Sequence, residues 1–356
     1  MSLHFHSLTV KEITKETEDC VSISFQIPSE LQDQFTYTQG QSIAIKHTIQ
    51  GQDIRRNYSI CSSPLEKDFR IAVKKIEGGL FSTYANEQLK AGEVLQVMSP
   101  AGKFYTALHS ANQKKYLAIA AGSGITPIIS IIKTTLATEP TSEFTLIYGN
   151  KNRNSIIFFE ELESLKNKYI TRFNLIYVLS RERTDDELHY GRINEEKLEA
   201  IKKLVNYKKQ DELFICGPQE LTLNSVAYFT KLGIDKNKIH KELFTASNTA
   251  KKEAINASKS KELCRIAIKS DGREFIVESD LQENHSILDI ALKQGADLPF
   301  ACKGGMCCTC KAKLLEGKVE MDVSWGLEED EIANGFILTC QSHPKTPNII
   351  IDFDVK

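Results

Sequence analysis

Residues 298–317 read LPFACKGGMCCTCKAKLLEG, which places four cysteines within nine residues. Three of them, Cys302, Cys307 and Cys310, have the spacing C-x4-C-x2-C, and Cys340 follows after a further 29 residues. Such a dense group of thiols indicates a disulfide-bonded loop, a zinc site or an iron–sulfur cluster. The choice between these three decides the fold of the C-terminal part of the chain.

The spacing favours an iron–sulfur cluster. C-x4-C-x2-C followed by a distant fourth cysteine is the ligand pattern of plant-type 2Fe–2S clusters. Gly304 and Gly305 allow the loop to curl tightly, and their N–H groups can point at the sulfides. Zinc sites usually repeat a short two-cysteine knuckle, whereas Cys340 stands alone. The predicted metal ligands are therefore Cys302, Cys307, Cys310 and Cys340.

The composition is that of an ordinary globular protein, with 41% hydrophobic and 26% charged residues among 356. The net charge of −2 argues against nucleic acid as a partner, because phosphate binding needs concentrated positive charge. No apolar run reaches the roughly 18 residues of a membrane span, and the N-terminus lacks the pattern of a secretion signal. We therefore expect a cytoplasmic protein with no membrane span, in which disulfides are rare.

The nine cysteines are unevenly distributed along the chain. Five lie between residues 302 and 340, and four are scattered: Cys20, Cys61, Cys216 and Cys264. An odd and uneven distribution favours metal binding or catalysis over disulfides. Because its neighbour Cys307 already fills the ligand position, Cys308 is interpreted as a packed free thiol.

The hydrophobic pattern predicts two different domains in the first 245 residues. Residues 1–110 contain short alternating segments, such as VSISFQI at 21–27, which predict the antiparallel strands of a small barrel. Residues 111–245 contain continuous apolar runs, which suit strands buried on both faces of a parallel sheet. Helical stretches at 126–138 and 155–169 alternate with these runs, as in a doubly wound α/β domain.

A linker and a third domain follow. Residues 246–262 are poor in large apolar side chains and are predicted as the linker. Within residues 263–356, an Asp271-Gly272 pair predicts a hairpin turn, and Ser286 is placed to cap a short helix. This last part resembles a plant-type ferredoxin domain, with Leu298-Pro299-Phe300 before the loop and LTCQ at 338–341 around the last ligand. The resemblance implies an α+β fold of the β-grasp type.

Two motifs in the barrel suit a flavin. RRNYSI, at 55–60, ends a predicted strand and offers an arginine for the pyrophosphate, a tyrosine ring for the isoalloxazine and a serine hydroxyl for N5. GGLFST, at 78–83, is predicted to open a helix whose N–H groups suit a diphosphate. Their order, with VKK at 73–75 between them, resembles the FAD-binding half of the ferredoxin–NADP reductase family. The resemblance implies FAD-binding roles for Arg56, Asn57, Tyr58, Ser59, Val73, Lys75, Gly79, Leu80, Phe81 and Ser82.

Two further motifs suit a pyridine nucleotide. AAGSGITP, at 120–127, follows an apolar run and precedes a helix, where a glycine-rich turn lets a pyrophosphate approach the backbone. The family's pyridine-nucleotide turn is matched by Gly122, Gly124 and Thr126. In that family a Cys-Gly-Pro lies beside the nicotinamide, which implies this role for Cys216, Gly217 and Pro218. The alternative for Cys216 is a buried cysteine at a strand end.

LSRE, at 179–182, bears on the choice between NADPH and NADH. An acidic residue here would bind a free ribose hydroxyl, whereas serine and arginine suit a 2′-phosphate. NADPH is therefore favoured by Ser180 and Arg181, helped by Arg192, and NADH is the alternative cofactor. In the other interpretation, Ser180 and Arg181 are solvated surface residues that bind no cofactor. Near the end of the domain, the family resemblance implies that Phe244 covers the flavin and that Glu242 lies near N5. The predicted catalytic residues are Ser59, Cys216 and Glu242.

The order of the domains, reductase first and ferredoxin last, resembles the reductase components of multicomponent oxygenases. The stretches at 300–322 and 326–341 are similar to the reductase subunits of phenylacetyl-CoA 1,2-epoxidases, which serve a di-iron enzyme; Cys308 departs from the small residue common there. The resemblance implies an oxidoreductase of phenylacetate degradation that passes electrons from NADPH through FAD and a 2Fe–2S cluster to a di-iron oxygenase. FAD is needed because NADPH gives two electrons together, whereas the cluster takes one at a time.

Two alternatives to this function stay open. One is a reductase of the same build for another acceptor, such as a steroid hydroxylase, a fatty-acid desaturase or the hybrid-cluster protein. The other is a redox-sensing or scaffold protein with vestigial cofactor sites.

Overall fold

The computed structural model describes residues 4–244 and 263–355. The chain divides between Thr245 and Ala246 into two compact units, which are described separately below. The predicted linker at 246–262 lies outside the described residues. No helix within the described ranges is long and apolar enough to cross a membrane.

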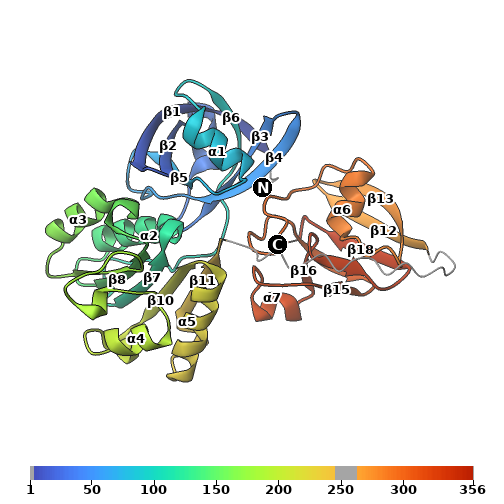
Figure 1. Cartoon of the computed structure of the whole chain (residues 1–356). Coiled ribbons are helices and arrows are strands. Elements are labelled where there is room, and N and C mark those ends of the chain that lie inside the picture. The colour runs from blue at the N-terminus through green and yellow to red at the C-terminus, as the bar shows by residue number, and fades with distance from the viewer. Residues whose placement is uncertain (1–3, 245–262, 356) are drawn as a thin grey trace. The chain divides into compact units, whose positions relative to one another are not determined.

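The first unit begins with an antiparallel barrel (Figure 1). Six strands follow the order β4-β3-β6-β1-β2-β5, and the bridge between Ile60 and Ile71 joins the end of β4 to β5, which closes the sheet. One face of each strand fills the interior, where Ile23, Ile43 and Ile71 are fully buried. The elements are β1 (Phe5–Thr17), β2 (Cys20–Gln26), β3 (Ser42–Ile49), β4 (Gln52–Ser59), β5 (Phe69–Lys74), α1 (Leu80–Glu87) and β6 (Val94–Met98).

Strand β2 differs from the expected half-buried strand. The alternation predicts Val21, Ile23 and Phe25 inside, which is confirmed, but Ser22 and Ser24 on the other face are buried as well. Their hydroxyls donate to carboxylates that share this face. Ser22 donates to Glu16, 2.6 Å away, and Ser24 to Asp68. Hydrogen bonding allows small polar side chains to be buried without a large free-energy penalty.

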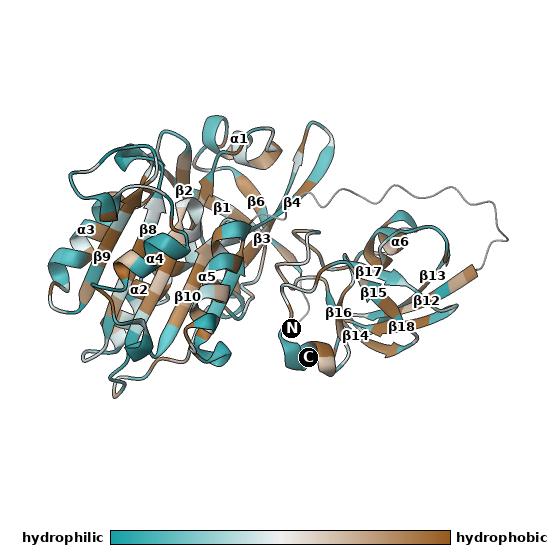
Figure 2. Ribbon diagram, turned by 60° about the horizontal axis from the view of Figure 1, so that its bottom comes forward, coloured by the Kyte–Doolittle hydropathy of each residue, from teal (hydrophilic) through white to brown (hydrophobic). Residues whose placement is uncertain are grey.

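The second part of this unit is a parallel α/β domain. Five strands, all parallel, follow the order β11-β10-β7-β8-β9, and helices cover both faces of the sheet. Figure 2 shows the hydrophobic strands behind helices with hydrophilic outer surfaces. The strands are β7 (Lys115–Ala121), β8 (Glu143–Asn150), β9 (Phe173–Leu179), β10 (Glu212–Gly217) and β11 (Ile239–Leu243). The helices are α2 (Ile125–Thr138), α3 (Phe159–Lys168), α4 (Glu195–Ile201) and α5 (Gln219–Lys231).

Helix α3 begins four residues later than the predicted start at 155. Phe158 adopts a left-handed backbone conformation with φ of 62°, which an α-helix does not contain. Ile156, Ile157 and Phe158 are buried before the helix begins, so these apolar residues serve the core rather than the helix.

The second unit has a mixed sheet of the β-grasp type in the order β13-β12-β18-β14-β16. Strands β12 and β18 are parallel, and helix α6 packs its buried face on the sheet. The predicted hairpin is confirmed, because Asp271 and Gly272 both have positive φ, as a type I′ turn requires. Its strands are β12 (Leu263–Ser270), β13 (Arg273–Asp280), β14 (Lys311–Glu316), β15 (Val319–Met321), β16 (Phe336–Leu338), β17 (Ser342–Pro344) and β18 (Asn348–Asp352). Its helices are α6 (Ile287–Lys293), capped by Ser286 as predicted, and α7 (Glu329–Ala333).

Candidate cofactor sites

The four predicted cluster ligands form two pairs of thiols. The strongest interaction of the Cys302 thiol is with Cys307, and that of the Cys340 thiol is with Cys310. The interaction with Cys307, together with backbone N–H groups of the loop, lowers the pKa of the Cys302 thiol, and the interaction with Cys310 lowers the pKa of the Cys340 thiol. No three His, Cys, Asp or Glu side chains of the described residues surround a single ion-sized point. Two pairs of sulfurs fit a cluster with two irons, each held by two thiolates.

The backbone around these thiols supplies donors to sulfur. The N–H of Gly304 donates to the sulfur of Cys302, 3.3 Å away, whereas the sequence predicted that the N–H groups of this glycine pair point at the sulfides of the cluster. At Gly305, with φ of 75°, a Cβ would lie 2.6 Å from the side chain of Val323. Only glycine therefore fits this position, and the loop can close around negatively charged sulfur.

Cys308 points elsewhere. Its thiol donates to the carbonyl of Gly326, and its backbone is left-handed with φ of 53°. A Cβ on Gly326 would lie 2.8 Å from the Cys308 sulfur. Cys308 is therefore packed against the segment before α7, in agreement with its interpretation as a thiol that is not a ligand.

The two flavin motifs meet on one side of the barrel. Tyr58, near the end of β4, and Phe81, in the first turn of α1, have ring centroids 5.6 Å apart. Asn57 donates to Ser42 on the neighbouring strand, 2.9 Å away, and Arg56 is exposed. Phe81 is only 1% exposed, so it supports the half-buried Tyr58 ring from the core side. The Tyr58 ring, an exposed cation and a helix N-terminus then form a surface that suits a planar, phosphate-bearing ligand.

Three predicted flavin residues have other partners. The Ser82 hydroxyl accepts from the N–H of Ile76 and donates to the carbonyl of Gly79, each at 3.2 Å, so it closes the turn before α1. Val73 lies fully buried in the barrel core. Lys75 forms an ion pair with Glu87, 3.1 Å away.

Ser59 and Glu242 are brought together from distant parts of the chain. The Ser59 hydroxyl at the end of β4 donates to the Glu242 carboxylate on β11, 3.3 Å away. Burial raises the pKa of Glu242 to about 7, although the bond from Ser59 favours the ionised form. This carboxyl group can therefore hold a proton near neutral pH.

A cavity of about 710 Å³ opens at the carboxyl ends of the parallel strands, where α/β domains bind their ligands. Six predicted residues line it: Gly122, Ser180, Arg192, Gly217, Pro218 and Phe244. Gly124 lies beneath the cavity, since a Cβ there would lie 2.2 Å from the carbonyl oxygen of Cys216. Thr126 donates to the carbonyl of Ser123, 3.0 Å away, and fixes the same turn. Cys216 is fully buried at the end of β10. The backbone N–H of Arg181 donates to the carbonyl oxygen of Lys151, 2.8 Å away.

Comparisons with known proteins assign a family to each of three parts of the chain. Three families match, described as an oxidoreductase FAD-binding domain over residues 7–105, an oxidoreductase NAD-binding domain over 118–225 and a 2Fe-2S iron-sulfur cluster binding domain over 268–345. A subunit of the 1,2-phenylacetyl-CoA epoxidase of Escherichia coli (strain K12) is 45% identical over 99% of this chain and 98% of its own length. The chain belongs to the family of oxygenase reductases.

Two other comparisons extend this result. The ferredoxin reductase component of 3-ketosteroid-9-alpha-monooxygenase from Rhodococcus rhodochrous is 31% identical over 97% of this chain and 96% of its own length. The structure of phthalate dioxygenase reductase aligns over 98% of both chains with a TM-score of 0.60 at 22% identity, which shows the shared fold. The predicted fold class and the predicted class of NAD(P)H-dependent oxidoreductase are confirmed.

Several polar cavity residues of this oxygenase reductase were missed by the reasoning from sequence. Lys74, the middle residue of the VKK motif, lines the cavity, whereas the predicted neighbours Val73 and Lys75 do not belong to its lining. The alternation of a strand carries the signal: Val73 points into the barrel, so Lys74 points out of it toward the nucleotide domain. Lys151 and Asn194, each in a loop of the nucleotide domain, were missed as well.

Proposed function

We propose that this reductase takes its electrons from NADPH and delivers them to the di-iron oxygenase component of a phenylacetyl-CoA 1,2-epoxidase. The observation that carries the choice of acceptor is the 45% identity to the E. coli protein, across nearly the full length of both chains. When bound, FAD and the 2Fe–2S cluster supply the redox chemistry that converts a two-electron donor into a source of single electrons.

The chain offers a binding region for each group. The loop cysteines hold the cluster as two pairs, Cys302 with Cys307 and Cys310 with Cys340. The strand end at 56–59, the start of α1 at 79–82 and Phe244 hold FAD. In support of this assignment, Tyr58 and Phe81 lie together, and Phe244 lines the adjoining cavity.

Residues at the strand ends orient the nucleotide. The turn at 122–124 presents backbone N–H groups at the start of α2, where a pyrophosphate is favoured. Gly217 and Pro218 leave the cavity open above Cys216, so the nicotinamide has room at the end of β10. The Glu242 carboxyl group can take up and release a proton near neutral pH, and it receives a hydrogen bond from Ser59.

The preference for NADPH rests on the opposite end of the cavity. Ser180 and Arg192 both line it, and Lys151 adds a second cation. A guanidinium and a hydroxyl suit the three oxygens of a 2′-phosphate. A direct role for Arg181 stays a prediction.

The function is tested in extract of phenylacetate-grown native cells depleted of this protein. Adding back the pure protein should restore NADPH oxidation that depends on phenylacetyl-CoA, and NADH at the same concentration should support a slower rate. Cys302→Ser is the matched control, because it alters one cluster ligand and leaves the flavin unit untouched. Reduction of ferricyanide with no response to phenylacetyl-CoA would retain the reductase and exclude this acceptor.

A steroid monooxygenase is the second candidate acceptor, favoured by the 31% identity to the Rhodococcus component over most of both chains. In the same extract assay, a response to a 3-ketosteroid in place of phenylacetyl-CoA would select it.

A further inference from the structure

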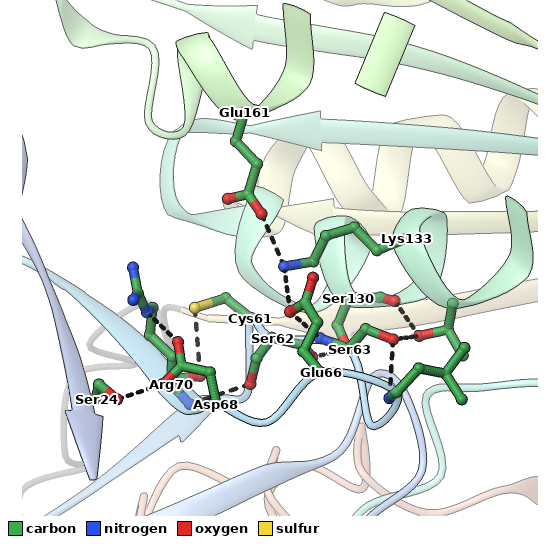
Figure 3. A network of polar contacts seen from close by, with 12 residues as sticks. Ser24, Cys61, Ser62, Ser63, Glu66, Asp68, Arg70, Ser130, Lys133 and Glu161 are labelled. Atoms are coloured by element: carbon green, nitrogen blue, oxygen red, sulfur yellow. Dashed lines mark hydrogen bonds and ion pairs between the residues drawn. The ribbon is translucent and has the colours of Figure 1, made fainter. Parts of the chain in front are cut away.

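A row of buried polar contacts joins the barrel to the nucleotide domain (Figure 3). The loop at 61–66, which follows β4, lies against one face of helix α2. The Ser130 hydroxyl of α2 donates to the carbonyl of Ser62, 2.6 Å away, and the hydroxyls of Ser63 and Thr134 lie 2.8 Å apart. We refer to these contacts as the α2 seam, formed by Ser62, Ser63 and Glu66 of the loop with Ser130, Lys133 and Thr134 of the helix.

Lys133 is the charged centre of the α2 seam. Only 9% of its side chain is exposed, and its ammonium lies 2.9 Å from Glu66 of the barrel and 2.8 Å from Glu161 of α3. Burial lowers the pKa of Lys133, but the two carboxylates more than offset this effect and raise it above its usual value. The lysine is therefore charged, held by Glu161 on its own domain and bonded to Glu66 across the interface.

The α2 seam fixes one relative placement of the two domains. Ser62, Ser63, Ser130 and Thr134 are all buried, so a shift that breaks the bond from Ser130 to Ser62 leaves the Ser130 hydroxyl without a partner. Thr134 and Ser63 each keep a second hydrogen bond within their own segment. Apolar contacts would permit sliding, whereas hydrogen bonds depend on direction and distance. Interfaces between domains of one chain are commonly mobile, and this row of buried polar pairs restrains such motion.

Both sides of the α2 seam continue directly into the cofactor sites. On the barrel side, the loop at 61–66 starts two residues after Ser59, the last residue of the flavin strand. On the other side, α2 starts at the turn around Gly124, and Ser130 lies roughly 9 Å farther along the helix at 1.5 Å per residue. A displacement at the α2 seam would therefore move the nucleotide turn relative to the flavin strand.

We propose that Lys133 is a positioning residue for hydride transfer. Together with the α2 seam it holds the nucleotide turn at the distance from the barrel that transfer from NADPH requires, an inference that rests on the proposed use of NADPH and FAD by this chain. Replacing Lys133 by Met keeps the length of the side chain but leaves a carboxylate from each domain, Glu66 and Glu161, without the ammonium that joins them. The two domains should then separate slightly at this edge.

The test measures flavin reduction by NADPH in the FAD-loaded full chain, with no oxygenase present. Lys133→Met should slow reduction at saturating NADPH by about 10- to 100-fold, the loss expected when reacting groups are misplaced by about 1 Å. FAD content and the Kd for NADP⁺ should stay within about twofold of wild type, because neither binding region is altered. Backbone amide hydrogen exchange at 61–66 and 125–134 should become faster, which is a readout independent of activity. The control is Lys231→Met, which removes the same charge far from the α2 seam. Lys231, on α5, forms an exposed ion pair with Glu195 of α4.

Three further variants keep the test decisive. Lys133→Arg should recover most of the rate, since a guanidinium can bridge the same two carboxylates. Glu66→Gln, which weakens the contact across the interface, should slow reduction more than Glu161→Gln, which weakens a contact within one domain. If Lys133→Met does not fold, Ser130→Ala removes a single hydrogen bond of the α2 seam and should give a smaller loss of rate with the same faster exchange.

Faster exchange with a wild-type rate of flavin reduction would overturn the positioning role. Loss of FAD in proportion to loss of rate would overturn it also, because the lysine would then only stabilise the fold. Since no oxygenase is present, a wrong assignment of the acceptor would leave these results unchanged.

Discussion

Replacing Glu242 by Gln should remove a pH-dependent loss of stability from the first unit. The Glu242 carboxyl has a pKa of about 7 in the folded chain, against an ordinary value of 4.5. Below pH 4.5 it is protonated in the folded and in the unfolded chain, so it adds no pH dependence. Between these two values the folded chain keeps a proton that the unfolded chain has released, so stability falls as the pH rises. Above pH 7 both states are ionised, and the loss is complete.

The size of this loss follows from the two pKa values. At about 1.4 kcal/mol per pKa unit their difference corresponds to about 3 kcal/mol, of which about 2.5 kcal/mol falls between about pH 5 and pH 8. For a unit of this size, 1 kcal/mol shifts Tm by about 2–4 °C. Relative to wild type, Glu242→Gln should therefore gain about 5–10 °C in Tm when the pH is raised from about 5 to 8.

The assay is thermal melting of the FAD-loaded protein at both pH values, with FAD content checked. Ser59→Ala should move the wild-type transition to higher pH, because it removes the hydroxyl that favours the ionised carboxylate. Glu143→Gln is the matched control, since Glu143 lies in an exposed ion pair with Lys115. Parallel pH curves for wild type and Glu242→Gln would show that the carboxyl is not buried as described.

Three other substitutions test the cofactor sites. Cys302→Ser should abolish electron delivery to cytochrome c or an oxygenase while NADPH still bleaches the flavin, and loss of flavin bleaching in a folded variant would contradict the assignment of the cluster site. Gly124→Ala places a Cβ 2.2 Å from the rigid carbonyl oxygen of Cys216. It should therefore destabilise the first unit by about 1–3 kcal/mol, measured by thermal melting, and weaken NADP⁺ binding, measured by titration. An unchanged Kd for NADP⁺ would refute the close contact. Arg192→Gln should raise the KM for NADPH by about 10- to 100-fold, because a charged hydrogen bond is lost, and should leave the KM for NADH unchanged. An equal rise in the two KM values would exclude a contact of Arg192 with the 2′-phosphate.

Features that depend on residues close together in the sequence could be predicted from the sequence alone. The strand and its apolar inner face at VSISFQI, the turn at Asp271-Gly272 and the cap at Ser286 are local features, and the structure has each of them. The cysteine spacing is local for Cys302 and Cys307, which the structure pairs, whereas Cys310 is paired with the distant Cys340. These elements could be predicted because the responsible interactions span only a few residues.

Features that depend on contacts between distant parts of the chain could not be predicted from the sequence. The burial of Ser22 and Ser24 depends on Glu16 and Asp68, and both carboxylates lie outside strand β2. Ser82 was expected to face a phosphate, yet its hydroxyl closes the turn before α1. The α2 seam joins residues about 70 positions apart, and no spacing in the sequence predicts that Lys133 forms an ion pair with Glu66. In each case the tertiary partner decides the role of a side chain whose type alone permits several roles.

The two thiol pairs differ in how much chain separates their members, and this difference sets the order in which the pairs can form. Cys302 and Cys307 are five positions apart, whereas Cys310 and Cys340 are 30 apart. Closing the longer loop costs about 1.6 kcal/mol more in chain entropy, and it can happen only after residue 340 has been synthesised. The nascent chain therefore contains a local pair of thiols well before the second pair can form. The arrival of Cys340 therefore determines when all four predicted ligands can come together.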